Sequence, residues 1–233
     1  MVFLTLMYHL VDRDVSSEWS VPQESFVAQM HALCEMDVNF LNLRDVSRIL
    51  DGRMTVNRGV LVTFDDGYRN TVGTVLPILE AYGIPATVSL CSSYLFPGRP
   101  KETPHVSQDF AYANDIYTWL ATGRDIAGHT YDHPDLSGLS DCDAEWQIAG
   151  DQKILEKTFN RPLDAFFYPF GLSTPSVRRI TAKYYGYAFG IEDGEIPSAQ
   201  SRYNIKRQGV YPRWSIDEFR GQVSGGLAAV ENG

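Results

Sequence analysis

The sequence has few cysteines and contains neither a long apolar run nor a cluster of basic residues. Its three cysteines, Cys34, Cys91 and Cys142, are odd in number and widely spaced, which indicates neither a disulfide framework nor a cysteine-based zinc site. No segment approaches the ~20 apolar residues that a membrane-spanning helix needs. The net charge of −9 argues against nucleic-acid or anionic-membrane partners, because a broad phosphate contact requires a basic face.

Targeting and nucleotide-binding signals are also missing. The apolar N-terminus, residues 1–11, has no basic leader and no small-residue cleavage site, so we expect the first strand of the fold there, not a signal peptide. A cytoplasmic protein is therefore expected, or an extracytoplasmic one if an upstream segment is missing. The glycine patterns of dinucleotide-binding and P-loop folds are absent, so a nucleotide-binding sheet has no support.

Strand and helix patterns alternate about seven times along the 233 residues, without an internal linker or repeat. This alternation predicts a single α/β domain over 1–233 with a mostly parallel sheet, closed or nearly closed into a barrel. Residues 224–233 are small and polar, and we expect a flexible tail there. The expected strands are 2–7, 38–43, 59–64, 85–91, 125–128, 165–168, 187–191 and 205–211. The expected helices are 22–36, 44–50, 71–82, 108–121, 143–159, 175–185 and 215–223.

Two adjacent carboxylates, Asp65 and Asp66, follow the predicted strand 59–64 and precede Gly67. Like charges side by side cost free energy unless a cation or a hydrogen-bonding role separates them. In parallel α/β folds the carboxyl end of a strand is also where sites are built. Asp and Gly favour turns in any case, so a polar turn before the next helix is an equally good interpretation of this motif alone.

A histidine pair, His129 and His133, follows the predicted strand 125–128. In a helical turn, a spacing of four places both imidazoles on one face, close enough to share a metal ion. By itself such a pair is more often unrelated to metal. However, strand carboxyl ends converge on one rim, which would bring the pair to the carboxylates. One carboxylate and two imidazoles make a three-ligand set with open positions, as catalytic metal sites require.

Together, the segments 63–67 (Thr-Phe-Asp-Asp-Gly) and 129–133 (His-Thr-Tyr-Asp-His) resemble the first two motifs of the polysaccharide deacetylases, the NodB-homology family or carbohydrate esterase family four. Segments 84–87 (Ile-Pro-Ala-Thr) and 168–171 (Tyr-Pro-Phe-Gly) add to the resemblance, which runs over about residues 4–219. The resemblance implies a distorted (β/α) barrel of seven or eight mostly parallel strands. It also implies hydrolysis of N-acetyl groups on an amino-sugar oligo- or polysaccharide.

The resemblance implies roles for the matching residues. Asp65 resembles the general base that takes a proton from water. Asp66, His129 and His133 resemble the ligands of one divalent metal ion, usually zinc, with cobalt, nickel, iron or manganese in some members. Such an ion acidifies water and polarises the acetamide carbonyl.

The third motif implies a site wall and an oxyanion donor. The backbone N–H of Phe170, after Tyr168 and Pro169, matches the family's second oxyanion donor. Its first position departs from the family, because Phe167 stands where an Arg that pairs with the catalytic Asp is usual. Arg207, near the end of the last predicted strand, could supply that charge, although a lone Arg is more often a surface residue.

The family's C-terminal acid histidine is missing, since no histidine follows His133. The N-terminal Met-Tyr-His of residues 7–9 instead resembles the start of the subgroup that deacetylates poly-N-acetylglucosamine, in which the motifs are permuted and the acid histidine comes first. His9 stands at a strand end and can reach the same rim. The resemblance therefore implies that His9 is the general acid.

Two alternatives stay open at this point. One keeps the fold and changes the bond, to an O-acetyl ester or a cyclic amide. The other is a carbohydrate-binding domain that retains the metal with little turnover, for which the missing motif Arg is the main support. The sequence carries no signal for oligomeric state or for the particular glycan.

Overall fold

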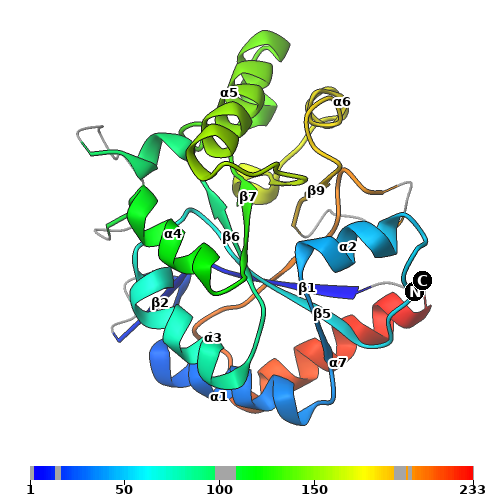
Figure 1. The fold of residues 1–233 in the computed structure, drawn as a ribbon. Coiled ribbons are helices and arrows are strands. Elements are labelled where there is room, and N and C mark those ends of the chain that lie inside the picture. The colour runs from blue at the N-terminus through cyan, green and yellow to red at the C-terminus, as the bar shows by residue number, and fades with distance from the viewer. Residues whose placement is uncertain (1–2, 14–16, 98–108, 192–197, 199–200, 233) are drawn as a thin grey trace.

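Eight parallel strands form one curled sheet in the computed structural model, which describes residues 3–13, 17–97, 109–191, 198 and 201–232 (Figure 1). The hydrogen-bonded order is β10-β1-β5-β6-β7-β8-β9, and β4 pairs with the first half of β5. The strands are β1 (Phe3–Tyr8), β4 (Asn39–Leu41), β5 (Gly59–Phe64), β6 (Thr87–Leu90), β7 (Asp125–Gly128), β8 (Ala165–Phe167), β9 (Tyr187–Phe189) and β10 (Gln208–Gly209). The predicted distorted barrel of parallel strands is confirmed.

The segment 205–209 joins the two edges of this sheet. Ile205 forms a parallel bridge with Phe189 of β9, and its N–H donates to the carbonyl of Ala188 at 2.9 Å. Three residues later β10 pairs with β1, with Gln208 opposite Leu6. This stretch of residues 205–209, which we call the seam segment, therefore connects β9 to β1, and Arg207 lies within it.

Seven helices surround the sheet in the described chain, and the larger hydrophobic cluster fills the space between helices and strands (Figure 1). They are α1 (Gln23–Glu35), α2 (Leu43–Leu50), α3 (Leu76–Tyr82), α4 (Ala113–Ala121), α5 (Asp141–Phe159), α6 (Pro175–Thr181) and α7 (Ile216–Asn232). A π-helical turn, Thr71–Val75, leads into α3. A parallel pair, β2 (Leu10–Asp12) and β3 (Ser20–Pro22), extends beyond the end of β1.

The amino end of the barrel is filled by α2. Leu43, Val46 and Ile49 of this helix belong to a cluster that includes Phe3 and Leu61 of the barrel strands. The helix starts with a capping box between Asn42 and Asp45, and the hydroxyl of Tyr187 donates to the carbonyl of Leu43 at 2.8 Å. With apolar side chains packed at this end, the polar residues that follow the strands gather at the opposite, carboxyl end.

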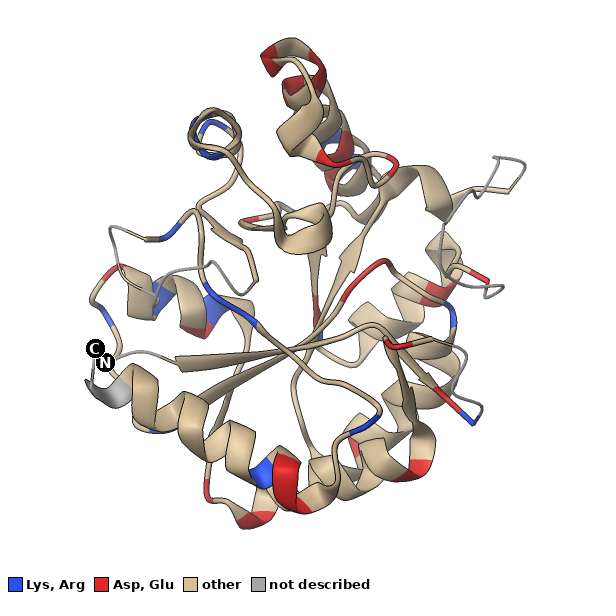
Figure 2. Cartoon of the chain, turned by 180° about the vertical axis from the view of Figure 1, so that it is seen from behind, with Lys and Arg blue, Asp and Glu red and all other residues tan. Residues whose placement is uncertain are grey.

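Charged residues are distributed unevenly. Figure 2 shows both Lys and Arg and Asp and Glu spread over many elements, with several acidic residues close together at the start of α5, where the sequence has Asp141, Asp143 and Glu145. Among the helices of the described chain, none has both the length and the hydropathy that crossing a bilayer requires.

The expected flexible tail is wrong for the part of it that is described. Residues 224–232 continue α7 to Asn232, and Leu227 is buried. The small residues serve close packing: a Cβ at Gly226 would lie 2.8 Å from Leu4 Cδ1 of β1. What looked like a flexible composition is therefore the contact surface of a helix.

Two element boundaries also differ from expectation. The helix expected over 108–121 begins only at Ala113, and residue 108 lies outside the described residues. The strand expected over 205–211 keeps two ladder residues, because Ile205 bridges to β9 on one side and the pairing with β1 ends at Gly209 on the other. Residue propensities predict that a short element is present better than they predict where it begins and ends.

The fold generates a prediction at Gly128, the last residue of β7. A Cβ there would lie 2.2 Å from Tyr185 Oη and 3.0 Å from Asp151 Oδ2. We expect Gly128→Ala to lower the free energy of unfolding by about 1–3 kcal/mol, the usual cost of overpacking, as measured by urea denaturation.

The control is Tyr185→Phe, which removes a hydroxyl that is buried without a hydrogen-bond partner in the described structure. This variant alone should be close to neutral, and combined with Gly128→Ala it should recover part of the loss, because the ring carbon Cζ would still lie 2.8 Å from the new Cβ. Equal losses with and without the hydroxyl would show that the clash is not the cause.

Candidate active site

The two carboxylates at the end of β5 face different surroundings. The N–H of Asp65 still continues the ladder with β1, donating to the carbonyl of Tyr8 at 2.9 Å. Asp66 and Gly67 then both have φ of +72°, in the left-handed region that favours glycine. This turn separates the side chains, so that Asp65 meets an arginine and Asp66 meets the two histidines.

Asp65 is buried and paired with Arg207. Its Oδ1 accepts from Arg207 Nη1 at 2.7 Å and from Ser89 Oγ at 3.0 Å. Burial acts to raise the pKa of Asp65, but the positive charge of Arg207, with smaller contributions from His129 and His9, brings the pKa below its ordinary value. Asp65 is therefore ionised at neutral pH.

Arg207 takes the place expected for the missing motif arginine, and Phe167 supports it. Arg207 Nε donates to the carbonyl of Gly190 at 3.0 Å, and the Arg207 guanidinium lies 4.7 Å from the centre of the Phe167 ring. The side chain is fully buried, unlike the surface residue that a lone arginine usually is. The charge beside Asp65 thus comes from the seam segment, while the aromatic ring at the motif position packs against it.

Asp66, His129 and His133 form a cluster that could hold a metal ion. Asp66 Oδ1 lies 3.3 Å from His129 Nε2 and 3.2 Å from His133 Nε2, and it is buried without a hydrogen-bond partner in the described structure. Ligands at about 2.0–2.1 Å from one tetrahedral ion stand about 3.3 Å apart. The observed separations fit that geometry.

The tautomer of His129 also suits metal binding. Its Nδ1 lies 2.7 Å from the carbonyl oxygen of Phe167, which can only accept a hydrogen bond. The proton must then be on Nδ1, which leaves Nε2, on the side of Asp66, as the nitrogen that could bind a metal ion. The donor set therefore fits a divalent cation such as zinc, with positions left open for other ligands.

The histidines do not come together in the helical turn that their spacing suggested. Residues 129–135 form a loop in which Thr130 and His133 have φ of +72° and +64°. Thr130 Oγ1 accepts from the N–H of His133 at 3.0 Å, which holds the loop compact. Two left-handed residues replace the helical path, a feature that spacing alone cannot reveal.

His9 lies at the end of β1 on the same pocket. Its ring packs on Trp19, with centroids 4.8 Å apart, and its Nδ1 is buried without a hydrogen-bond partner in the described structure. Burial lowers the pKa of His9, although the charges of Asp66 and Asp65 oppose this effect. An imidazole near two carboxylates and without a fixed partner is well suited to carry a proton.

A pocket of about 160 Å³ brings most of the predicted site residues together. Phe170 lies at its rim with φ of +55°, 43% exposed, and its ring centroid is 4.7 Å from that of His133. Tyr168 and Pro169 are buried outside the lining, and the Tyr168 hydroxyl donates to the carbonyl of Tyr203 at 3.0 Å. The pocket is lined by Met7, His9, Leu10, Trp19, Asp65, Asp66, Tyr68, His129, His133, Phe170, Gly171 and Ile191.

The sequence matches the family model for polysaccharide deacetylase over residues 53–190, more than half of the chain. The chain belongs to the polysaccharide deacetylase family. YxkH of Bacillus subtilis (strain 168), a provisionally named polysaccharide deacetylase, is 26% identical over 217 residues, which cover 92% of this chain and 73% of that protein. The poly-beta-1,6-N-acetyl-D-glucosamine N-deacetylase of Staphylococcus aureus (strain MRSA252) is 25% identical over 202 residues, or 81% of this chain and 67% of that protein.

Solved structures share the fold. The Streptococcus pyogenes deacetylase PplD in complex with acetate has a TM-score of 0.84 at 21% identity, over 96% of this chain and 98% of that one. IcaB from Ammonifex degensii has a TM-score of 0.80 at 21% identity, over 95% and 97%. At 21% identity, the similarity to these two structures shows that the chain shares their fold.

Two residues of α5 that sequence reasoning missed hold the histidine loop in place. Gln147 Oε1 accepts from the N–H of Tyr131 at 3.0 Å, while its Nε2 donates to Asp132 Oδ1 at 2.6 Å. Asp151 is fully buried and accepts from the N–H of Ser92 at 2.9 Å and from that of His129 at 3.1 Å. The sequence signal that could have identified Gln147 and Asp151 is their position as polar residues on the inner face of a predicted amphipathic helix, where a buried polar group needs a hydrogen-bond partner.

Tyr68 is a third residue that was missed, although it follows the Asp-Asp-Gly motif directly. It lines the pocket, and burial together with the nearby charge of Asp66 raises the pKa of its hydroxyl. Its ring stacks on Phe110, with centroids 5.0 Å apart. Tyr68 therefore stays protonated and gives the pocket a rigid aromatic wall.

Removing Arg207 should strongly destabilise the protein. Arg207→Ala leaves the Asp65 carboxylate buried without its cation, for which we expect a loss of about 3–5 kcal/mol at neutral pH, measured by chemical denaturation. Arg207→Ala combined with Asp65→Asn should cost less than the sum of the two single changes. Strict additivity would contradict the proposed coupling.

The pH dependence of this contribution follows from the lowered pKa of Asp65. The stabilisation is complete above the unfolded pKa of about 3.9. It is lost only as the pH falls through the lower, folded pKa. In Arg207→Ala, burial without the opposing cation raises the pKa of Asp65, so this variant regains stability by protonating Asp65 at a higher pH than the parent does. The difference in unfolding free energy between the parent and Arg207→Ala should therefore be largest near pH 7 and shrink as the pH falls.

Removing Asp151 should weaken metal binding. Asp151→Ala leaves the N–H of Ser92 unpaired and removes one of the two acceptors of the His129 N–H, the other being the carbonyl of Leu90 at 3.1 Å, so the backbone that carries the ligand His129 is held less firmly. We expect zinc affinity to fall about 10- to 100-fold, as for other changes behind metal ligands, measured by competition with a chelating dye. Asp143→Ala, at an exposed position of the same helix, is the control and should leave the affinity unchanged. Equal affinities for both variants would show that Asp151 does not position His129.

Proposed function

We propose that this chain hydrolyses N-acetyl groups of an amino-sugar oligo- or polysaccharide, with one divalent metal ion bound by Asp66, His129 and His133. The observation that carries the proposal is that the two adjacent carboxylates have different partners. Asp66 Oδ1 meets two imidazole nitrogens at 3.3 and 3.2 Å, while Asp65 is held ionised by Arg207 beside the same pocket. Three convergent ligands and a separate carboxylate are the parts that metal-assisted hydrolysis needs.

Zinc is the ion we propose first, because two imidazoles and one carboxylate at tetrahedral separation are common zinc ligands. Cobalt, nickel, iron and manganese accept the same ligand types. When bound, such an ion would supply Lewis acidity to the acetyl carbonyl and to the attacking water.

Asp65 is proposed as the general base. Water adds through its oxygen to the acetyl carbon, and one of its protons passes to the Asp65 carboxylate. The low pKa of Asp65 keeps this group ionised but makes it a weak base. Such a base is effective only toward water that has been acidified, which is consistent with a metal site next to it.

His9 is proposed as the general acid. As the carbon–nitrogen bond breaks, a proton from the imidazolium goes to the leaving amine, and the products are acetate and a free amino group. Because the pKa of His9 is lowered, its imidazolium is a stronger acid than an ordinary histidine. Tyr168 and Pro169 lead into the turn at Phe170, whose backbone N–H is proposed to stabilise the oxyanion, an effect worth about 3 kcal/mol.

The size of the pocket favours a small acyl group on a large substrate. Pockets that hold whole drug-sized molecules measure about 300–1,000 Å³, whereas this one measures about 160 Å³. An acetamido group would enter it while the sugars lie outside. The Staphylococcus aureus relative, named for its action on poly-beta-1,6-N-acetyl-D-glucosamine, supports a substrate of this class.

The alternatives compare as follows. An O-acetyl ester or another amide presents the same carbonyl to the same groups, so these substrates belong in the assay. The metal-retaining binding domain drew its support from the missing motif arginine. Since Arg207 pairs with Asp65 at 2.7 Å, the charge is present and turnover is favoured.

The test is acetate release from chitooligosaccharides and from β-1,6-linked N-acetylglucosamine oligomers, with and without a chelator. Asp65→Asn should keep the metal and lose about 10²- to 10⁴-fold in kcat, the usual contribution of a general base. His129→Ala should lose both metal and activity. Metal content is measured on the same samples.

Asp135→Asn, in an exposed part of the histidine loop, is the control and should behave like the parent. Full activity of Asp65→Asn on every substrate of the parent would remove Asp65 as the base. Bound metal without acetate from any acetylated glycan would favour the binding domain instead.

A further inference from the structure

Trp19 forms the wall of the pocket next to His9. The rings of the two residues are 4.8 Å apart, tilted by 44°, and both residues line the pocket. The β2–β3 pair fixes this neighbourhood, because the N–H of Leu10 donates to the carbonyl of Trp19 at 3.2 Å. Trp19 is only half-buried, so part of its ring surface remains available to a ligand.

Further aromatic side chains support Trp19 from behind. Its ring centroid is 5.4 Å from that of Tyr211, and Tyr211 is 5.5 Å from Trp214. The guanidinium of Arg213 lies 4.4 Å from the centre of the Tyr211 ring. We call Trp19, Tyr211 and Trp214 the aromatic ladder. All three members are half-buried, and Trp214 also packs against the larger hydrophobic cluster.

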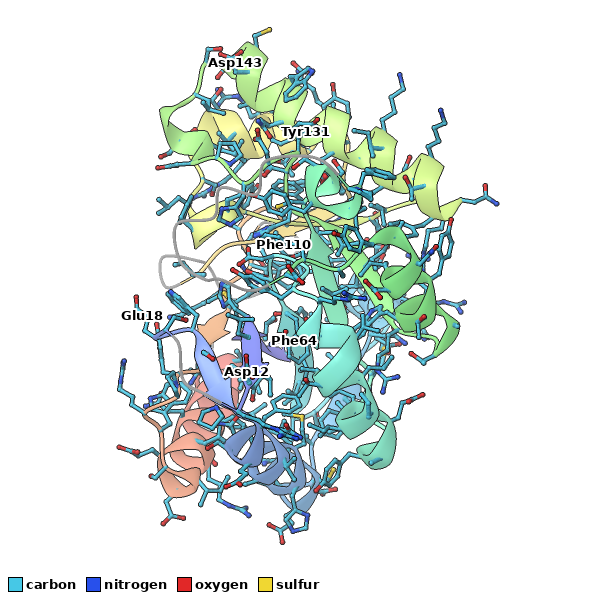
Figure 3. All side chains as sticks on the ribbon, turned by 90° about the vertical axis from the view of Figure 1, so that its left-hand side faces the viewer. Asp12, Glu18, Phe64, Phe110, Tyr131 and Asp143 are labelled. Carbon is cyan, nitrogen blue, oxygen red and sulfur yellow. The ribbon has the colours of Figure 1, made fainter. Side chains whose placement is uncertain are left out.

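A different aromatic group shows what a purely structural role looks like in this protein. Tyr68, Tyr94 and Phe110 also stack beside the pocket, but all three are buried in one cluster. Figure 3 labels Phe110, which is buried, near the middle of the view and Glu18, the exposed neighbour of Trp19, near its edge. The ladder is therefore placed to meet a ligand, and the buried cluster is placed to support the pocket.

The direction of proton transfer indicates which part of the substrate meets Trp19. On the proposed function, on which this step rests, His9 protonates the amine nitrogen. That nitrogen is bonded directly to the sugar ring, so the ring lies on the His9 side of the breaking bond. Phe170 and His133 adjoin each other on another part of the lining, where the carbonyl is proposed to lie.

We infer that Trp19 is a stacking surface for the pyranose ring that carries the acetamido group. A pyranose presents a face of C–H groups, and an indole offers a large, rigid apolar face whose polar N–H is at its edge. Contact with that face would select amino sugars over small acetylated compounds. The ladder behind Trp19 keeps the indole in place before substrate arrives, which limits the entropy lost on binding.

The binding test uses the Asp65→Asn protein, so that oligomers are bound without being consumed. Calorimetry with a β-1,6-linked N-acetylglucosamine tetramer and with chitotetraose gives the dissociation constants. We expect Trp19→Ala to weaken binding about tenfold or more, as truncation of a tryptophan in a binding site commonly does. Trp19→Tyr keeps an aromatic face and should recover most of the affinity.

The matched control is Trp146→Ala. Trp146 is 56% exposed on α5, packs on Tyr131 and does not line the pocket. This variant should bind the tetramers like its parent. It removes the same kind of side chain from the same protein, so it separates a general effect of losing an indole from the specific effect at Trp19.

The kinetic test separates stacking from orientation of His9. In the otherwise unchanged protein, Trp19→Ala should raise KM by about the same factor as Kd and change kcat much less. A fall in kcat with unchanged KM would mean that Trp19 only orients His9, and this would overturn the inference. Unchanged Kd and KM in a folded Trp19→Ala protein would overturn it too.

The outcomes distinguish this inference from the proposed function. If the parent releases acetate and Trp19→Ala binds the tetramers normally, the inference about Trp19 is wrong and the proposed function stands. No acetate release from any acetylated glycan by the parent sinks the proposed function, while the binding measurement still tests Trp19. If Trp19→Ala does not fold, as judged by its thermal unfolding, Trp19→Leu takes its place in both measurements.

Discussion

The ion pair between Asp65 and Arg207 is the interaction on which the site depends. Both side chains are buried, and Arg207 Nη1 donates to Asp65 Oδ1 at 2.7 Å. Removing either partner would leave a buried charge unpaired, at a cost of several kcal/mol in stability. The pair therefore fixes the segment 205–209, which also joins β9 to β1. Closure of the barrel and ionisation of the proposed base have the same physical origin.

The second constraint is the backbone path at the mouth of the barrel. Asp66, Thr130, His133 and Phe170 all have positive φ, a conformation that costs about 1–3 kcal/mol when strained and persists only when surrounding contacts impose it. Hydrogen bonds from Gln147 and Asp151 provide such contacts around the histidines. Four of the seven non-glycine residues with positive φ in the described chain thus lie where the ligands converge, and the other three, Asp37, Arg58 and Asn160, lie in connections between helices and strands.

Sequence motifs were sufficient to predict the parallel barrel and to bring the two carboxylates and the two histidines to one pocket, because strand carboxyl ends converge by topology. The helical turn at 129–133 was a wrong prediction, since local φ values depend on tertiary hydrogen bonds that no spacing reveals. The tail at 224–232 was wrong because small residues suit both flexible chains and close helix packing, and only the position of Leu4 decides between them. Asp151 was missed because its partners are backbone groups far away in the sequence.

Phe167 joins the two halves of the site. Its carbonyl oxygen holds His129 at 2.7 Å, and its ring lies 4.7 Å from the guanidinium that faces Asp65. A small displacement of β8 would carry the imidazole and the guanidinium along together. The residue that stands in place of the motif arginine therefore links one proposed metal ligand to the cation beside the proposed base, so a change at Phe167 would disturb both halves of the site at once.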